Sequence, residues 1–107
     1  MADTDPHFII ETSLYAMGFN YVKEYKFSSR KSKFDYAIPE IKLAIEYEGG
    51  TWSGGSHVRP GRYASDCEKY NLAQMMGWRV LRYTADMIKK TMIYDDLLRI
   101  KIELQND

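Results

Sequence analysis

Two neighbouring segments decide the fold that this chain predicts: FDYAIP at residues 34–39 and IKLAIEYEGG at residues 41–50. In the second segment large apolar residues alternate with small or polar ones, which is the period of a half-buried strand. The first segment alternates in the same way and places Phe34, Tyr36 and Ile38 on one face. The two segments therefore predict an antiparallel hairpin.

Three carboxylates, Asp35, Glu46 and Glu48, belong to these two strands. In a hairpin symmetric about Glu40 and Ile41, Asp35 lies directly across from Glu46 on the same face, with Cβ atoms roughly 5 Å apart. Like charges so placed destabilise a fold unless a positive charge lies between them. A divalent metal ion is the obvious candidate, because Mg²⁺ is typically held by one or two carboxylates.

The composition restricts the class of protein. A chain of 107 residues predicts one domain over residues 1–107, and 45% hydrophobic residues exclude a disordered chain. The formal net charge is zero, so any basic surface for nucleic acid has to be local. The single Cys67 has no disulfide partner within the chain, which favours a reducing compartment. No apolar run is long enough for a bilayer and no signal peptide is recognisable, so we expect a cytoplasmic protein without membrane contact.

Further helices and strands are expected around the hairpin. Asp5 followed by Pro6 predicts a helix start, and Gly18 predicts its end. A strand is expected at residues 21–27, and another at residues 78–83.

A second long helix is expected after a glycine-rich loop at residues 49–64. Residues 65–68 have the spacing of a capping box, which predicts that this helix begins there and ends near Met76, before Gly77. Lys69 begins a stripe of apolar residues at helical spacing that ends at Met76, so its side chain is predicted to face the sheet.

The last part of the chain predicts two more helices. Thr84 is a candidate cap for a short helix. An amphipathic helix follows, whose apolar stripe consists of Ile93, Leu97, Ile100 and Leu104.

The order of these residues resembles the PD-(D/E)XK nuclease superfamily, in which an acid on one strand is followed after about ten residues by acidic residues on the next. In this resemblance Asp35 is the first acid, Glu46 is the second, and Glu48 stands where the family usually has lysine. The chain is more similar to the very-short-patch-repair endonucleases and their small phage and bacterial relatives. The matching features run over roughly residues 8–90 and are EYEG at 46–49, a loop with His57, an acidic helix at 66–69 and GWRVLR at 77–82.

Two features depart from the family pattern. The lysine within the strand is absent, and Phe34 precedes Asp35 where the family has proline. The superfamily tolerates both departures, with a lysine on the following helix taking over. Lys69 is the natural substitute, in agreement with its predicted orientation toward the sheet.

The resemblance implies an α/β, restriction-endonuclease-like fold, with a mixed sheet of about four strands flanked by helices. It also implies a metal-dependent DNA endonuclease that cuts or nicks phosphodiester bonds. Mg²⁺ or Mn²⁺ would be held by Asp35, Glu46 and either the Glu48 side chain or the Tyr47 carbonyl, with Glu11 as an added ligand. A metal held in this way lowers the pKa of a bound water and polarises the phosphoryl oxygen.

The other candidate residues would act on the phosphate or on protons. Lys69 would stabilise developing negative charge, and His57 would transfer a proton. Contacts to DNA phosphates are expected from five basic residues: Arg30, Lys31, Lys33, Arg59 and Arg62. Each has a structural alternative: the acids as solvated strand charges, Lys69 as a lysine at a helix end that extends its ammonium to water, and the basic run as a charged edge strand.

A second function stays open: a catalytically weak or inactive nuclease-fold accessory factor that binds nucleic acid or another protein. The neutral net charge and the lack of an appended DNA-binding domain favour it, or else favour a homodimer or a protein partner that supplies specificity. The expected partner is DNA, with branched and nicked DNA both left open. If the chain is encoded by a phage, the expected location is the cytoplasm of the host cell.

Overall fold

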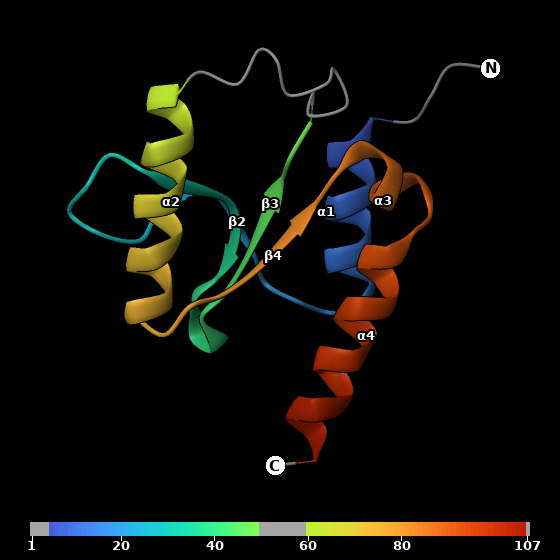
Figure 1. Cartoon of the computed structure of the whole chain (residues 1–107). Helices are drawn as coiled ribbons and strands as arrows, with labels where there is room; N and C mark the ends of the chain where they lie inside the picture. Colours follow the sequence, from blue (N-terminus) through green and yellow to red (C-terminus); the bar gives the residue numbers. More distant parts are fainter. Residues whose placement is uncertain (1–4, 50–59, 107) are drawn as a thin grey trace.

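A mixed four-stranded sheet forms the centre of the protein (Figure 1). The structure, a computed structural model, describes residues 5–49 and 60–106. The strands are β1 (Val22–Lys26), β2 (Lys33–Ile38), β3 (Leu43–Tyr47) and β4 (Arg79–Tyr83). They lie in the order β1-β2-β3-β4, with β2 antiparallel to both of its neighbours and β4 parallel to β3.

Helices cover both faces of this sheet. They are α1 (Pro6–Ala16), α2 (Pro60–Met75), α3 (Ala85–Lys89) and α4 (Met92–Gln105), and a 3₁₀ turn, η1 (Pro39–Ile41), joins β2 to β3. Figure 1 shows α2 on one side of the sheet and α1, α3 and α4 on the other. The predicted fold class, a mixed four-stranded sheet flanked by helices, is confirmed.

The hairpin of β2 and β3 has the register that the sequence predicts. Tyr36 pairs with Ile45 and Ile38 pairs with Leu43, so the centre of the hairpin falls within η1, as expected. Lys42 closes the turn in the left-handed conformation, with φ of 50°, and donates its backbone N–H to the Pro39 carbonyl at 3.1 Å.

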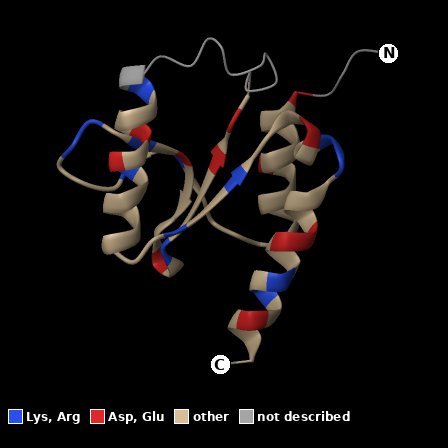
Figure 2. Cartoon of the chain, in the orientation of Figure 1, with Lys and Arg blue, Asp and Glu red and all other residues tan. Residues whose placement is uncertain are grey.

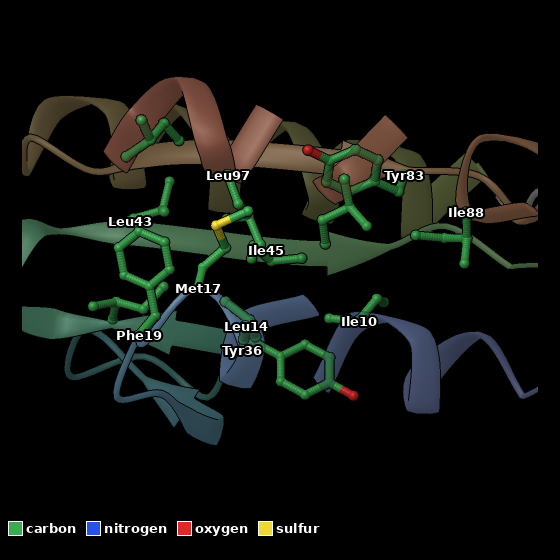
Figure 3. Close-up of a cluster of buried hydrophobic side chains, with 13 residues drawn as sticks. Ile10, Leu14, Met17, Phe19, Tyr36, Leu43, Ile45, Tyr83, Ile88 and Leu97 are labelled. Atoms are coloured by element: carbon green, nitrogen blue, oxygen red, sulfur yellow. The ribbon is translucent and has the colours of Figure 1, made fainter. Parts of the chain in front are cut away.

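The larger hydrophobic core fills the space between the sheet and the layer of α1, α3 and α4 (Figure 3). Tyr36, Ile45 and Tyr83 point into it from the sheet and meet Leu14 of α1 and Leu97 of α4. Burial of these side chains fixes the hairpin register, because a slip by one residue would turn the whole apolar face toward the other side.

A smaller core lies between the sheet and α2. Phe34 belongs to it, so the prediction that Phe34 shares a face with Tyr36 is wrong. The Phe34 ring stacks on Phe27 with ring centroids 4.1 Å apart. The regular alternation of β2 is therefore broken at Asp35. On the neighbouring strand β1, Glu24 has φ of 53°, which non-glycine residues rarely adopt. The two strands pair on either side of this position, Lys23 with Tyr36 and Tyr25 with Phe34.

The second long helix begins earlier than the sequence predicts. α2 starts at Pro60, where the fixed φ and the missing N–H of proline suit the first turn, so the capping-box interpretation of residues 65–68 is wrong. The helix ends at Met75, and Gly77 follows with φ of 85°, which confirms the predicted stop.

Two residues expected in apolar stripes are exposed instead. Met76 is 37% exposed, because it follows the end of α2 and leaves the helical spacing there. Leu104 is 42% exposed, because α4 extends past the sheet at its C-terminal end (Figure 1). In the described part of the chain, no helix has the length and apolar character needed to cross a membrane.

Candidate functional site

The carboxylates of Asp35 and Glu46 are built into the end of the β2–β3 hairpin. The Asp35 backbone N–H donates to Glu46 Oε2 at 2.7 Å, and the Tyr47 backbone N–H donates to Asp35 Oδ2 at 2.8 Å. Each acid thus accepts a hydrogen bond from the backbone of the opposite strand, and such bonds to ionised groups are stronger than neutral ones. The two acids lie next to each other, as the predicted register requires.

The positive charge beside these acids comes from the chain itself. Lys69 of α2 forms an ion pair with Glu46 Oε1, and their side chains are only 12% and 6% exposed. The predicted orientation of Lys69 toward the sheet is confirmed. The positive charge expected beside the acids is therefore supplied at Glu46 by the Lys69 ammonium group, and the expected metal ion stays a prediction.

Tyr70 is a site residue that the sequence reasoning missed. Its hydroxyl donates to Glu46 Oε1 at 2.9 Å. Burial, together with the negative charge of Glu46, raises the pKa of Tyr70, so the hydroxyl stays protonated and remains a donor. The Arg82 guanidinium lies 4.3 Å from the centre of the Tyr70 ring. The available signal was helical spacing, since Tyr70 lies three residues before the buried Ala73.

Glu48 is paired with a different residue. Its Oε1 accepts hydrogen bonds from both Arg82 Nε, at 2.8 Å, and Arg82 Nη2. The expectation that Asp35, Glu46 and either the Glu48 side chain or the Tyr47 carbonyl hold one metal ion stays a prediction, and the contact with Arg82 gives Glu48 a partner of its own. Within residues 5–49 and 60–106 no three acidic, histidine or cysteine side chains are grouped closely enough to hold a metal.

A second polar cluster lies between β2 and α1, around Glu11 of α1. Tyr36 Oη donates to Glu11 Oε2 at 2.9 Å, and Lys23 Nζ lies 3.3 Å from the same oxygen. The hydrogen bond from Tyr36 is the main cause that lowers the pKa of Glu11, so this carboxylate is ionised at neutral pH. His7 Nδ1 lies 2.8 Å from Tyr36 Oη. Because the Tyr36 hydrogen is donated to Glu11, His7 Nδ1 must be the donor to Tyr36.

This cluster opens to the surface beside Asp35. A small pocket of about 70 Å³ is lined by His7, Lys23, Glu24, Asp35 and Tyr36. Among the described residues, none donates a hydrogen bond to Asp35 Oδ1, while Oδ2 accepts the Tyr47 N–H. Glu11 is joined to this pocket through Tyr36, and its proposed role as a metal ligand stays a prediction.

The basic residues predicted to contact DNA lie at the surface. Arg30 and Lys31 are exposed on the turn between β1 and β2, next to α2 (Figure 2), and Lys33 is exposed at the first position of β2. Arg30 Nη1 lies 3.6 Å from Glu68 Oε2 of α2. Arg62 is exposed near the start of α2. His57 and Arg59, the other two predicted residues of the loop, lie outside the described residues.

Comparison with known proteins supports the fold. No protein-family model matches the chain, and no curated protein matches it. The sheet order and the flanking helices define a restriction-endonuclease-like fold. A similar solved structure is titled "Homing Endonuclease I-Bth0305I Catalytic Domain", with a TM-score of 0.61 and 20% sequence identity over 96% of this chain and 92% of that chain.

The pairing of Glu46 with Lys69 determines what neutralising this acid does to stability. Converging acids without a counterion would repel, and Glu46→Gln would then raise the melting temperature. The buried ion pair reverses the expected change in stability, because the substitution leaves Lys69 without its counterion. We expect Glu46→Gln to lower the free energy of unfolding in EDTA by about 1–3 kcal/mol, measured by urea denaturation.

A matched control for this measurement is Glu103→Gln. Glu103 pairs with Arg79 at 3.0 Å, but both side chains are 55% exposed, so we expect a change of less than about 0.5 kcal/mol. Equal effects of the two substitutions would contradict a structural role for the Glu46–Lys69 pair.

Proposed function

We propose that this protein is a metal-dependent DNA endonuclease of the PD-(D/E)XK type, which cuts or nicks phosphodiester bonds. The observation that carries the proposal is the grouping of Asp35, Glu46 and Lys69 at the end of one hairpin. Two carboxylates beside a lysine provide the chemistry that phosphodiester hydrolysis requires, and the restriction-endonuclease-like fold is consistent with it.

The residues present fit a hard divalent cation such as Mg²⁺ or Mn²⁺. Asp35 supplies Oδ1, and Glu46 supplies a second carboxylate that is held in place by the Asp35 N–H. Of the two candidates for a third ligand, the Tyr47 carbonyl is favoured, because Glu48 is engaged by Arg82. A cation bound there would lower the pKa of a water and polarise the phosphoryl oxygen.

The chain's own groups prepare the site for a phosphate. Lys69 carries a positive charge in a nearly buried position, where it interacts with negative charge more strongly than it would in water. Tyr70 fixes the orientation of Glu46 through its hydroxyl. The exposed Arg30, Lys31 and Lys33 provide a local basic surface for the DNA backbone, which compensates for the zero net charge of the chain.

One assay tests the proposal directly. Supercoiled, linear and branched DNA are incubated with the purified protein in Mg²⁺, in Mn²⁺ and in EDTA, and the products are separated on a gel. We expect nicking or cleavage with either metal and none with EDTA. DNA binding without cleavage under all conditions would support the accessory-factor alternative instead.

A further inference from the structure

The carboxylate of Glu46 accepts hydrogen bonds at both of its oxygens. Oε2 accepts the Asp35 N–H at 2.7 Å, and Oε1 accepts the Tyr70 hydroxyl at 2.9 Å and the Lys69 ammonium. The Glu46 side chain is 6% exposed, so little of it is open to solvent. A cation that approaches Glu46 Oε1 therefore meets another cation already in contact with it.

We propose that Lys69 competes with the divalent metal ion for Glu46, so that the ion pair holds down the metal affinity of the site. The inference rests on the proposed function, because it concerns the regulation of the same site. A monovalent and a divalent cation on one carboxylate oxygen repel each other, and weak solvent screening at this depth makes the repulsion strong. The Glu46–Lys69 pair is thus the resting state of the site.

Lys69 is the one donor of the three that is able to leave. The Asp35 N–H belongs to the backbone of β2, and the Tyr70 ring is covered by the Arg82 guanidinium. The Lys69 ammonium ends a flexible four-carbon chain and has Glu46 as its ion-pair partner among the described residues. The rings of Phe34 and Tyr70 lie 5.7 and 5.3 Å from its Nζ, within the range of cation–π contacts, which are weaker than an ion pair.

The test is the affinity of the metal-free protein for Mn²⁺, measured by isothermal titration calorimetry without DNA. We expect Lys69→Met to tighten Mn²⁺ binding about tenfold, within the usual range of coupling between two ligands. Lys69→Gln keeps a neutral donor toward Glu46 but removes the charge, so it should also tighten Mn²⁺ binding. This variant provides a second measurement if the methionine variant folds poorly. Tyr70→Phe removes a neutral donor from the same oxygen and should change the affinity less than about threefold.

Lys42→Met is the matched control for a loss of positive charge. Lys42 is exposed at the far end of β3 and donates to the Met76 carbonyl at 2.9 Å, away from Glu46. Its substitution should leave Mn²⁺ affinity unchanged. If Lys42→Met and Lys69→Met tighten Mn²⁺ binding equally, the inference is overturned, because the loss of any positive charge would then raise the metal affinity.

The remaining outcomes separate the inference from the proposed function. Wild-type protein that binds Mn²⁺, together with Lys69 variants that bind it equally or more weakly, would overturn the competition while the metal site stands. Absence of Mn²⁺ binding from the wild type and from every variant would overturn the metal-dependent function itself. Binding by the Lys69 variants alone would support the competition in its strongest form.

Discussion

Glu46→Gln and Asp35→Asn are each expected to reduce the rate of metal-dependent DNA cleavage at least about a hundredfold. Loss of one group that stabilises the charge of the transition state, directly or by holding the metal ion, typically lowers the rate by that factor. Both acids lie at the end of the β2–β3 hairpin and accept backbone hydrogen bonds across it. Either substitution removes one negative charge from the pair that would hold the metal. The measurement is the single-turnover cleavage rate at saturating Mg²⁺ and DNA.

Glu40→Gln is the control, because Glu40 is an exposed acid on η1 at the opposite end of the same hairpin. It should cleave at the wild-type rate. Stability has to be measured alongside, since Glu46→Gln also breaks a nearly buried ion pair. Undiminished cleavage by a folded Glu46→Gln protein would refute the assignment of the site.

Lys69→Ala is expected to lower the single-turnover rate about a hundredfold while DNA affinity changes little, because the ammonium would act on charge that develops during the reaction. The ion pair with Glu46 places this ammonium beside the acids, and the side chain is only 12% exposed. The rate should fall even though Mn²⁺ binding tightens. Rate and metal affinity that move in opposite directions would be hard to explain by a general loss of structure.

Lys33→Ala provides the contrast, because Lys33 is exposed at the start of β2 and is proposed to contact only the DNA backbone. It should weaken DNA binding and reduce its dependence on salt, with a normal single-turnover rate. If Lys69→Ala behaves like Lys33→Ala, then Lys69 positions the phosphate and takes no part in the chemical step.

The local pattern of the chain was enough to predict the hairpin and its centre. Residues 36–38 and 43–45 alternate with a period of two on the paired strands, and a register slip would expose their apolar face, so the hydrophobic pattern specifies the register. Gly18 and Gly77 were predictable helix stops for a similarly local reason, since both adopt positive φ. The inward orientation of Lys69 followed from helical spacing within α2.

The start of α2 and the face of Phe34 were not predictable in this way. A capping-box spacing at residues 65–68 competes with Pro60 as a helix start, and only the complete fold decides between them. Phe34 leaves the alternation of β2 and stacks on Phe27 on the α2 side, and this partner comes from the residue that directly follows β1.

The strand pattern was sufficient to predict which acids meet, because two adjacent strands bring Asp35 and Glu46 together. The groups that neutralise these acids depend on packing between distant segments. Lys69 and Tyr70 reach Glu46 from a helix more than twenty residues away in the chain, and Arg82 takes Glu48 from the parallel strand β4. Charge balance in a nearly buried site depends on which groups are packed against it. Helical spacing indicated that Lys69 faces the sheet, but it does not identify which acid on a distant strand the side chain meets.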